Sequence, residues 1–272
     1  MVRNSKRTAL KRAAATVGSR VRRRVPGIRV LIYHWIGGNS GLQLDIPLPA
    51  FTEQLRSAGQ HLSLGDALRA CGTGTDPEIS GTVLTFDDGF ADTFANCLTL
   101  FSDEGIPATF YLTTGDIVRG WIWTSAGVAK AVSPQLLREA AANPLFNFGS
   151  HSHSHRPLVG LSGAEIHEEL TRSRSLIEDW VGRSVDDFAY PKGLWNERTN
   201  EIVRLHFRSA AISGSRPVGP GTDPYRLRRY PIQASDDPML FRAKLDGAMF
   251  LEDSARSARD RLLRLTGRQP RR

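Results

Sequence analysis

The stretch TVLTFDDG, residues 82–89, determines how the rest of the chain is interpreted. Its first five residues are apolar or β-branched, which is typical of a buried strand. Asp87 and Asp88 follow at once, and Gly89 ends the run. Parallel α/β folds place their chemistry at such strand ends. Because successive residues of an extended chain point in opposite directions, one carboxylate can bind a metal while its neighbour stays free as a base. The alternative is a plain strand-to-turn Asp-Asp-Gly, which is common in α/β proteins.

A second apolar stretch ends in polar ligands at FGSHSHSH, residues 148–155. Neutral imidazole is the commonest metal-binding side chain, and two histidines with one carboxylate make a usual open zinc site. The alternative is a histidine-rich surface loop that binds metal only adventitiously. The presence of both strand ends in one domain favours the metal site.

The two motifs together resemble those of the polysaccharide deacetylases of carbohydrate esterase family 4, the NodB-like domains. TFDDG at 85–89 is similar to the first motif of that family, and HSHSH at 151–155 is similar to the second. The resemblance covers roughly residues 28–235 of the chain. It implies a metal-dependent hydrolase that removes N-acetyl groups from the amino sugars of a glycan or glycoconjugate.

The resemblance also assigns roles to individual residues. It implies that Asp87 is the catalytic base and that Asp88, His151 and His155 bind a divalent metal ion, for which zinc is expected. The middle histidine, His153, falls on a position that varies in the family. In this scheme the metal activates a water molecule and polarises the acetamide, and Asp87 takes the proton of the water.

Two further motifs depart from the usual family pattern. FAYPKG at 188–193 has Ala189 where the family usually carries an arginine that contacts the base. The backbone N–H of Tyr190 is, by resemblance, a donor to the tetrahedral oxyanion. The chain has no histidine after His206, so the usual C-terminal Leu-x-x-His motif is missing.

LIYH at 31–34 has the spacing of that missing motif, but near the start of the chain. The first and last strands of a closed barrel are neighbours, so moving the motif leaves the histidine in the same place. The sequence therefore resembles the circularly permuted branch that includes the poly-N-acetylglucosamine deacetylases, with His34 as the catalytic acid. The alternative is that His34 is a packed histidine at a strand end.

Strands and helices alternate along the chain, which predicts an α/β fold with a parallel sheet. Functional residues at several strand ends predict a closed (β/α) barrel, and the resemblance narrows this to the distorted barrel of about seven parallel strands. We expect a basic N-terminal arm over residues 1–27, the barrel over 28–266, and a basic tail over 267–272. Trp121 and Trp123 either line a sugar cleft or pack inside, and packing is favoured.

The positive charge of the chain is concentrated in residues 1–25, which hold nine Lys or Arg and no acidic residue. The other residues carry 27 basic against 28 acidic groups, so the folded domain gives no reason to expect nucleic-acid binding. The arm is either a solvated tail, a helix on an anionic membrane surface or a nucleic-acid contact.

Two cysteines and no long apolar run predict a cytoplasmic protein, either free or peripheral at the inner membrane face. The expected substrate is an N-acetylated glycan or a lipid-linked saccharide. The alternatives to an N-deacetylase are a weak or inactive carbohydrate-binding domain, which Ala189 motivates, and an O-acetyl esterase.

Overall fold

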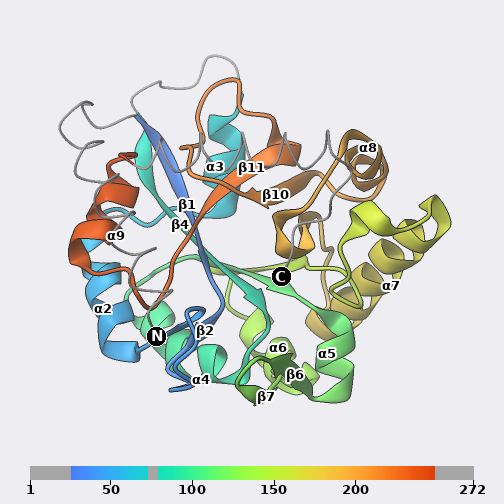
Figure 1. Ribbon diagram of the computed structural model, residues 1–272, viewed down its shortest axis with the longest axis horizontal. Helices are drawn as coiled ribbons and strands as arrows, with labels where there is room; N and C mark the ends of the chain where they lie inside the picture. The colour runs from blue at the N-terminus through green and yellow to red at the C-terminus, as the bar shows by residue number, and fades with distance from the viewer. Residues whose placement is uncertain (1–25, 73–78, 249–272) are drawn as a thin grey trace.

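The computed structural model describes residues 26–72 and 79–248. Within these residues, seven parallel strands close into a barrel in the order β1-β11-β10-β9-β8-β5-β4 (Figure 1). The predicted barrel is therefore confirmed. The barrel strands are β1 (Gly27–Tyr33), β4 (Ser80–Asp88), β5 (Ala108–Leu112), β8 (Phe146–Ser150), β9 (Asp187–Ala189), β10 (Ser209–Ser213) and β11 (Leu227–Pro231).

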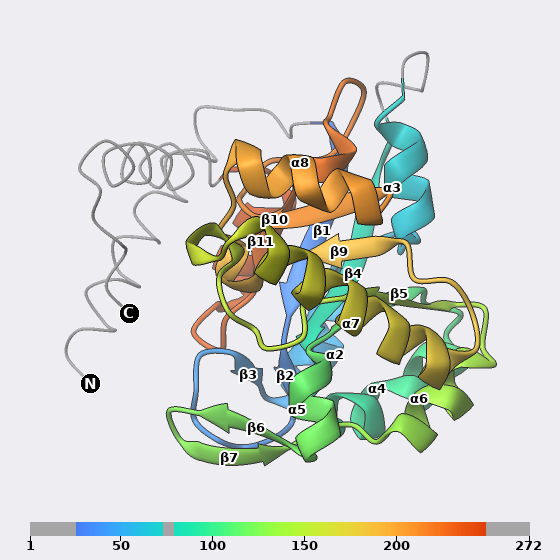
Figure 2. The same cartoon turned by 90° about the vertical axis from the view of Figure 1, so that its right-hand side faces the viewer.

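Helices cover the outside of the barrel, and short ribbons extend from it (Figures 1 and 2). The helices are α2 (Leu48–Ser57), α3 (Leu64–Ala70), α4 (Ala91–Asp103), α5 (Thr114–Arg119), α6 (Pro134–Ala141), α7 (Gly163–Val181), α8 (Glu197–His206) and α9 (Pro238–Leu245), with single turns η1 (Leu158–Gly160), η2 (Pro191–Gly193) and η3 (Pro224–Arg226). The ribbons pair β2 (Trp35–Ile36) with β3 (Asp45–Ile46), and β6 (Trp121–Thr124) with β7 (Gly127–Lys130). No helix in the described part of the chain combines the length and apolar character needed to span a bilayer.

The barrel closes where the first strand of the chain meets the last. Strand β1 pairs with β4 on one side and with β11 on the other, so that Val30 lies opposite both Val83 and Arg229. A permuted order of the motifs requires that the first and last strands of the barrel are adjacent in this way. In the same register Tyr33 lies opposite Phe86, which brings His34 level with Asp87 at the carboxyl end of the barrel.

Side chains along the strands point alternately outward and inward. The outward side chains form an aromatic layer, and the inward ones fill the interior of the barrel. The rings of Phe86, Phe110 and Phe148 stack between strands and helices, with centroids 5.3 and 5.8 Å apart. Inside the barrel, a Cβ added at Gly149 would lie 2.5 Å from the ring of Tyr111. A side chain at position 149 would therefore displace the buried tyrosine.

Long α7 begins and ends as its sequence predicts. Ser162 and Glu165 form a reciprocal capping box, with hydrogen bonds of 2.8 and 3.3 Å, and Gly182 takes the left-handed conformation at the other end. Cys97, expected to be a small buried hydrophobe, is fully buried in α4.

Several sequence predictions differ from the structure. Strand β1 ends before His34 and β2 begins after it, and Gly27, assigned to the arm, already belongs to β1. Helix α3 and the β6–β7 hairpin were not predicted. The preference for packed indoles is wrong, since Trp123 is 71% exposed and Trp121 is 41% exposed. The basic arm before residue 26 and the tail over 267–272 lie outside the described residues.

Candidate active site

The adjacent carboxylates lie at the carboxyl end of β4, as the sequence predicts. Asp88 has a backbone φ of 73°, and Gly89 follows with a φ of 97°. A left-handed conformation is uncommon for a residue other than glycine and is enriched at functional sites. It turns the chain directly after Asp87, so the two carboxylates face different parts of the barrel mouth.

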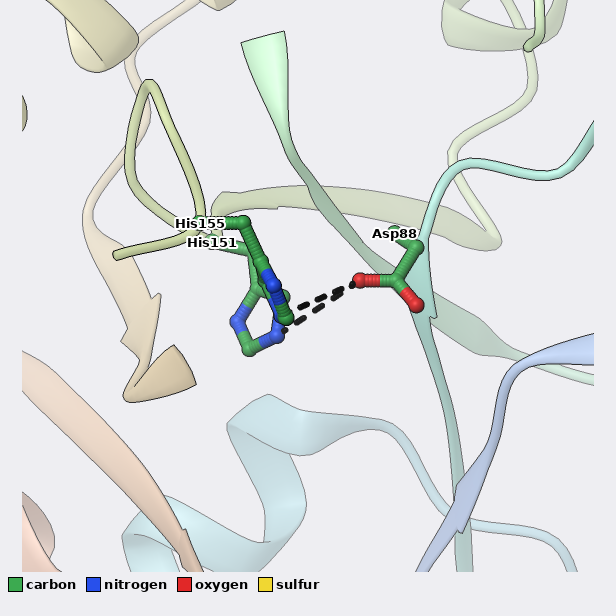
Figure 3. A group of neighbouring side chains, drawn as sticks. All are labelled: Asp88, His151 and His155. Carbon is green, nitrogen blue, oxygen red and sulfur yellow. Dashed lines mark ion pairs between the residues drawn. The ribbon is translucent and has the colours of Figure 1, made fainter. Parts of the chain in front are cut away.

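Asp88 meets two histidines that come from β8 and the loop after it (Figure 3). Its Oδ1 lies 3.5 Å from the Nε2 of His155 and 3.8 Å from the Nε2 of His151. One ligand atom from each residue lies within 4.8 Å of the other two. The three residues expected to bind metal are thus brought together.

The chemistry of these side chains fits a divalent cation. The Nδ1–H of His151 donates to the Ala189 carbonyl at 2.8 Å, which leaves the Nε2 lone pair directed at the group. Burial lowers the pKa of His151 to about 3 and also lowers the pKa of His155, so both imidazoles are neutral. Burial raises the pKa of Asp88 to about 6, a cost that a bound cation offsets. Two neutral imidazoles and one carboxylate are a zinc donor set.

A buried glutamate on α7 holds the loop between the two histidines. Glu169 accepts hydrogen bonds from the backbone N–H groups of His153 and Ser154, at 2.9 and 2.8 Å. It also accepts one from the Ser154 hydroxyl at 2.5 Å. The loop needs this support because Ser152 and His155 both have positive φ, 66° and 57°.

The middle histidine of the motif points away from the other two. The Nδ1 of His153 lies 2.9 Å from the Thr114 hydroxyl at the start of α5. Its carbonyl accepts the N–H of Gly115 at 2.8 Å. His153 therefore ties the loop to α5 and is not part of the group around Asp88.

Asp87 forms a buried ion pair that the sequence interpretation missed. The two Nη atoms of Arg229 lie 2.6 and 2.8 Å from the two carboxylate oxygens of Asp87. The side chains are 4% and 2% exposed. Burial raises the pKa of Asp87, but Arg229 and the neighbouring imidazoles together lower it to about 2. Asp87 is therefore ionised and fixed in orientation, 3.8 Å from the Nε2 of His151.

Arg229 makes the contact with the Asp87 carboxylate that an arginine at position 189 would make in the usual motif. It comes from β11, which only β10 separates from β9, the strand that carries Ala189. The guanidinium also donates to the Thr85 hydroxyl at 3.0 Å and lies 4.9 Å from the ring centre of Tyr111. An arginine at an inward position of a strand two residues before Pro231 was the available signal.

His34 follows β1 at the same end of the barrel. Its carbonyl accepts the Thr93 hydroxyl at 2.9 Å, which fixes the break between β1 and β2. Its charge lowers the pKa of both Asp87 and Asp88, although burial remains the largest influence on each. Among the described residues, the buried Nδ1 of His34 has no hydrogen-bond partner.

The expected role of Tyr190 does not fit this structure. Its backbone N–H donates to the Ala211 carbonyl at 3.0 Å, because pairing with β10 continues one residue beyond the end of β9. That N–H is therefore committed to the barrel and is not available to an oxyanion.

Comparison with known proteins agrees with this geometry. The family model "Polysaccharide deacetylase" matches residues 75–208, a range that contains Asp87, Asp88 and both histidines of the group. The matched family model and the barrel fold together support a NodB-like polysaccharide deacetylase. Two residues near Asp87 lie outside the matched range: Arg229 on β11 and His34 directly after β1, at the seam where the barrel closes.

Relatives of the deacetylase include YxkH of Bacillus subtilis (strain 168), which is assigned to the polysaccharide deacetylases and is 24% identical over 174 residues. The match covers 62% of this chain and 58% of YxkH, so the chain spans little more than half of that protein. IcaB from Ammonifex degensii matches with a TM-score of 0.69 at 22% identity, over 81% of this chain and 97% of IcaB. The Streptococcus pyogenes deacetylase PplD, solved with acetate, matches at 0.67 and 21% identity, over 80% and 98%. These structures share the fold.

Proposed function

We propose that this deacetylase is a metal-dependent hydrolase that removes N-acetyl groups from amino-sugar residues of a glycan or glycoconjugate. The observation that carries the proposal is the ionised, arginine-held carboxylate of Asp87 beside the group Asp88, His151 and His155. A base next to a cation site with an open position is the arrangement that metal-assisted hydrolysis needs.

Asp88, His151 and His155 would hold the cation, and zinc suits their donor atoms. When bound, a divalent cation supplies Lewis acidity, which makes water more acidic and polarises an acyl oxygen. Asp87 accepts the proton of the attacking water, and each of its oxygens keeps a lone pair beyond its bond to Arg229. The low pKa keeps the carboxylate of Asp87 ionised and able to accept a proton, and Arg229 fixes its orientation.

His34 completes the proposed reaction as the proton donor. The water oxygen bonds to the acyl carbon, the C–N bond breaks, and His34 gives a proton to the departing amine. The products are acetate and a free amino sugar. The pairing of Asp87 with Arg229 supplies the contact that Ala189 lacks, which removes the reason for expecting an inactive domain.

The test of this function uses His34→Ala with two substrates. We expect acetate release from an N-acetylhexosamine oligomer to fall by about 10² to 10⁴-fold, because an amine is a poor leaving group without a proton. Hydrolysis of an aryl acetate should change little, because its leaving group needs no acid. His206→Ala, which removes a half-buried histidine at the end of α8, is the matched control.

Near wild-type cleavage of the amide by His34→Ala would show that His34 only packs at a strand end. Wild-type hydrolysis of acetate esters of a sugar, without cleavage of the N-acetyl oligomer, would favour the O-acetyl esterase instead.

A second test concerns the support of the cation site. Glu169→Gln keeps the shape of the side chain but loses the charge that accepts three hydrogen bonds from the loop. We expect the affinity of metal-depleted protein for Zn²⁺ to fall by about 10 to 100-fold, as is typical when the partners of metal ligands are removed. Glu168→Gln, the exposed neighbour on the same helix, should bind as wild type does.

Competition with a chelator measures this affinity without turnover. His151→Ala with His155→Ala sets the floor, because two of the three ligands are gone. Equal affinities for Glu169→Gln and Glu168→Gln would mean that the loop holds its shape without the buried carboxylate.

A further inference from the structure

Exposed apolar side chains concentrate on one short segment beside the mouth of the barrel. Among the described residues, six large hydrophobic side chains are exposed, and four of them lie between residues 118 and 128. They are Val118 on α5, Trp121 and Trp123 on β6, and Val128 on β7. We call these four residues the hairpin patch. Clusters of this kind on a soluble domain mark contact surfaces.

The hairpin is built so that one face is buried and the other is apolar but exposed. Ile122 and Ala129 pair across it and pack into the core, each 5% exposed. Trp123 lies opposite Val128 on the outer face, and Trp121 lies opposite Lys130. The buried pair Ile122 and Ala129 fixes the hairpin against the core, so the indoles on its outer face stay exposed to solvent.

The patch stands next to the catalytic mouth. The N–H of Val132, two residues after β7, donates to the Gly89 carbonyl at 2.9 Å, and Ala131 bridges to Phe90. These contacts join the base of the hairpin to the residues directly after Asp88. Figure 2 shows the β6–β7 and β2–β3 ribbons together at this end of the barrel.

The composition of the patch favours a lipid surface over a sugar chain. No acidic residue occurs from 117 to 133, and Lys130 flanks the apolar side chains, while Arg119 is paired with Asp116. Exposed valines offer nothing to a hydroxyl-rich ligand, and a site for sugars needs carboxylate or amide partners. Tryptophan at a rigid tip with lysine beside it is the pattern of side chains that enter a bilayer interface.

The charge of the remaining chain points to the same partner. Residues 1–25 carry nine basic and no acidic side chains. Stable attachment of a peripheral protein takes two weak signals, such as an apolar insertion and a polybasic segment. A 25-residue segment reaches at most about 80 Å, so it can contact the same surface although β1 starts at the far end of the barrel.

We propose that the hairpin patch inserts into the interface of an anionic lipid bilayer and holds the catalytic mouth at the membrane surface. The indoles of Trp121 and Trp123 enter the headgroup region, and Lys130 faces the anionic headgroups. An enzyme held in this way meets acetylated saccharides that are themselves attached to lipid.

The experiment is sedimentation of the full chain with vesicles of phosphatidylcholine alone or mixed with phosphatidylglycerol. We expect binding to the mixed vesicles, and a loss of about tenfold or more in Trp121→Ala with Trp123→Ala. Leu205→Ala is the matched control, because Leu205 is 75% exposed on α8, away from the patch. High salt should weaken binding by the basic segment while the difference between these variants persists.

Tryptophan fluorescence gives a second readout that needs no turnover. The wild-type spectrum should shift to the blue on mixed vesicles, and Trp121→Phe with Trp123→Phe should lose that shift. All variants should keep wild-type hydrolysis of a soluble aryl acetate. The proposal is overturned if wild-type protein stays in the supernatant, or if the double alanine variant binds as wild type does. It is also overturned if that variant loses only affinity for a soluble N-acetylhexosamine oligomer, which would make the patch a sugar platform.

Discussion

Asp87→Asn is expected to lower acetate release from an N-acetylhexosamine oligomer by about 10² to 10⁴-fold while the protein keeps its metal. The amide cannot take the proton of the water, although it fills the same space. Asp88 rather than Asp87 lies in the group with His151 and His155, so the cation should stay. Elemental analysis and the acetate assay on one preparation measure both quantities.

Asp88→Asn is the matched control for this prediction, because it makes the same change, one oxygen to an NH2 group, at the adjacent carboxylate. It should lose metal affinity and activity together. If Asp87→Asn lost the metal and Asp88→Asn kept it, the roles of the two carboxylates would be reversed.

Arg229→Met is expected to lower the free energy of unfolding by about 3 to 5 kcal/mol at neutral pH, because it leaves the Asp87 carboxylate buried without its partner. Methionine fills part of the arginine volume, so the loss reports the charge more than a cavity. Chemical denaturation monitored by fluorescence gives the value. Arg228→Met, at the adjacent half-buried position of β11, should cost much less.

The pH dependence identifies the cause of this loss. In the wild type the folded pKa of Asp87 is about 2, below its ordinary value of 3.8. The pair therefore contributes stability above pH 3.8 that is lost as the pH falls through 2. Without Arg229, burial raises the pKa of Asp87. As the pH falls, protonation of Asp87 then removes the unpaired buried charge from the variant. The difference between the two proteins should narrow with acid, and Asp87→Asn with Arg229→Met should recover part of the loss. A difference that is constant with pH would show that Arg229 stabilises by packing alone.

The metal group could be predicted because its signals are local. Asp88 ends one apolar strand, His151 follows another directly and His155 lies in the same loop, and parallel strands bring their carboxyl ends to one edge. The position of His34 followed from closure of the barrel. Arg229 could not be found in this way, because its partner Asp87 lies 142 residues away in the chain. Its position two residues before Pro231 is the one local signal, and that signal does not identify Asp87 as its partner.

Tyr190 and the hairpin show a different limit of the sequence. The resemblance implies that the N–H of Tyr190 is free to bind an oxyanion, but pairing with Ala211 extends one residue beyond β9. Trp-Ile-Trp in β6 has the alternation of a half-buried strand, and the pattern does not state which side is buried. Here the single isoleucine faces the core and the two indoles face out, because the hairpin packs through Ile122 and Ala129.

In the proposed mechanism, activity depends on closure of the barrel at the seam between β1 and β11. Contacts between distant segments form late, because the intervening chain must be ordered before they return free energy. The cation ligands are contributed by β4 and the β8 region, whereas the guanidinium that orients Asp87 arrives with the last strand of the barrel. A polypeptide that has folded only as far as β10 can gather its metal ligands but lacks an oriented base. A barrel that has not yet added β11 therefore lacks the contact with Arg229 that orients Asp87.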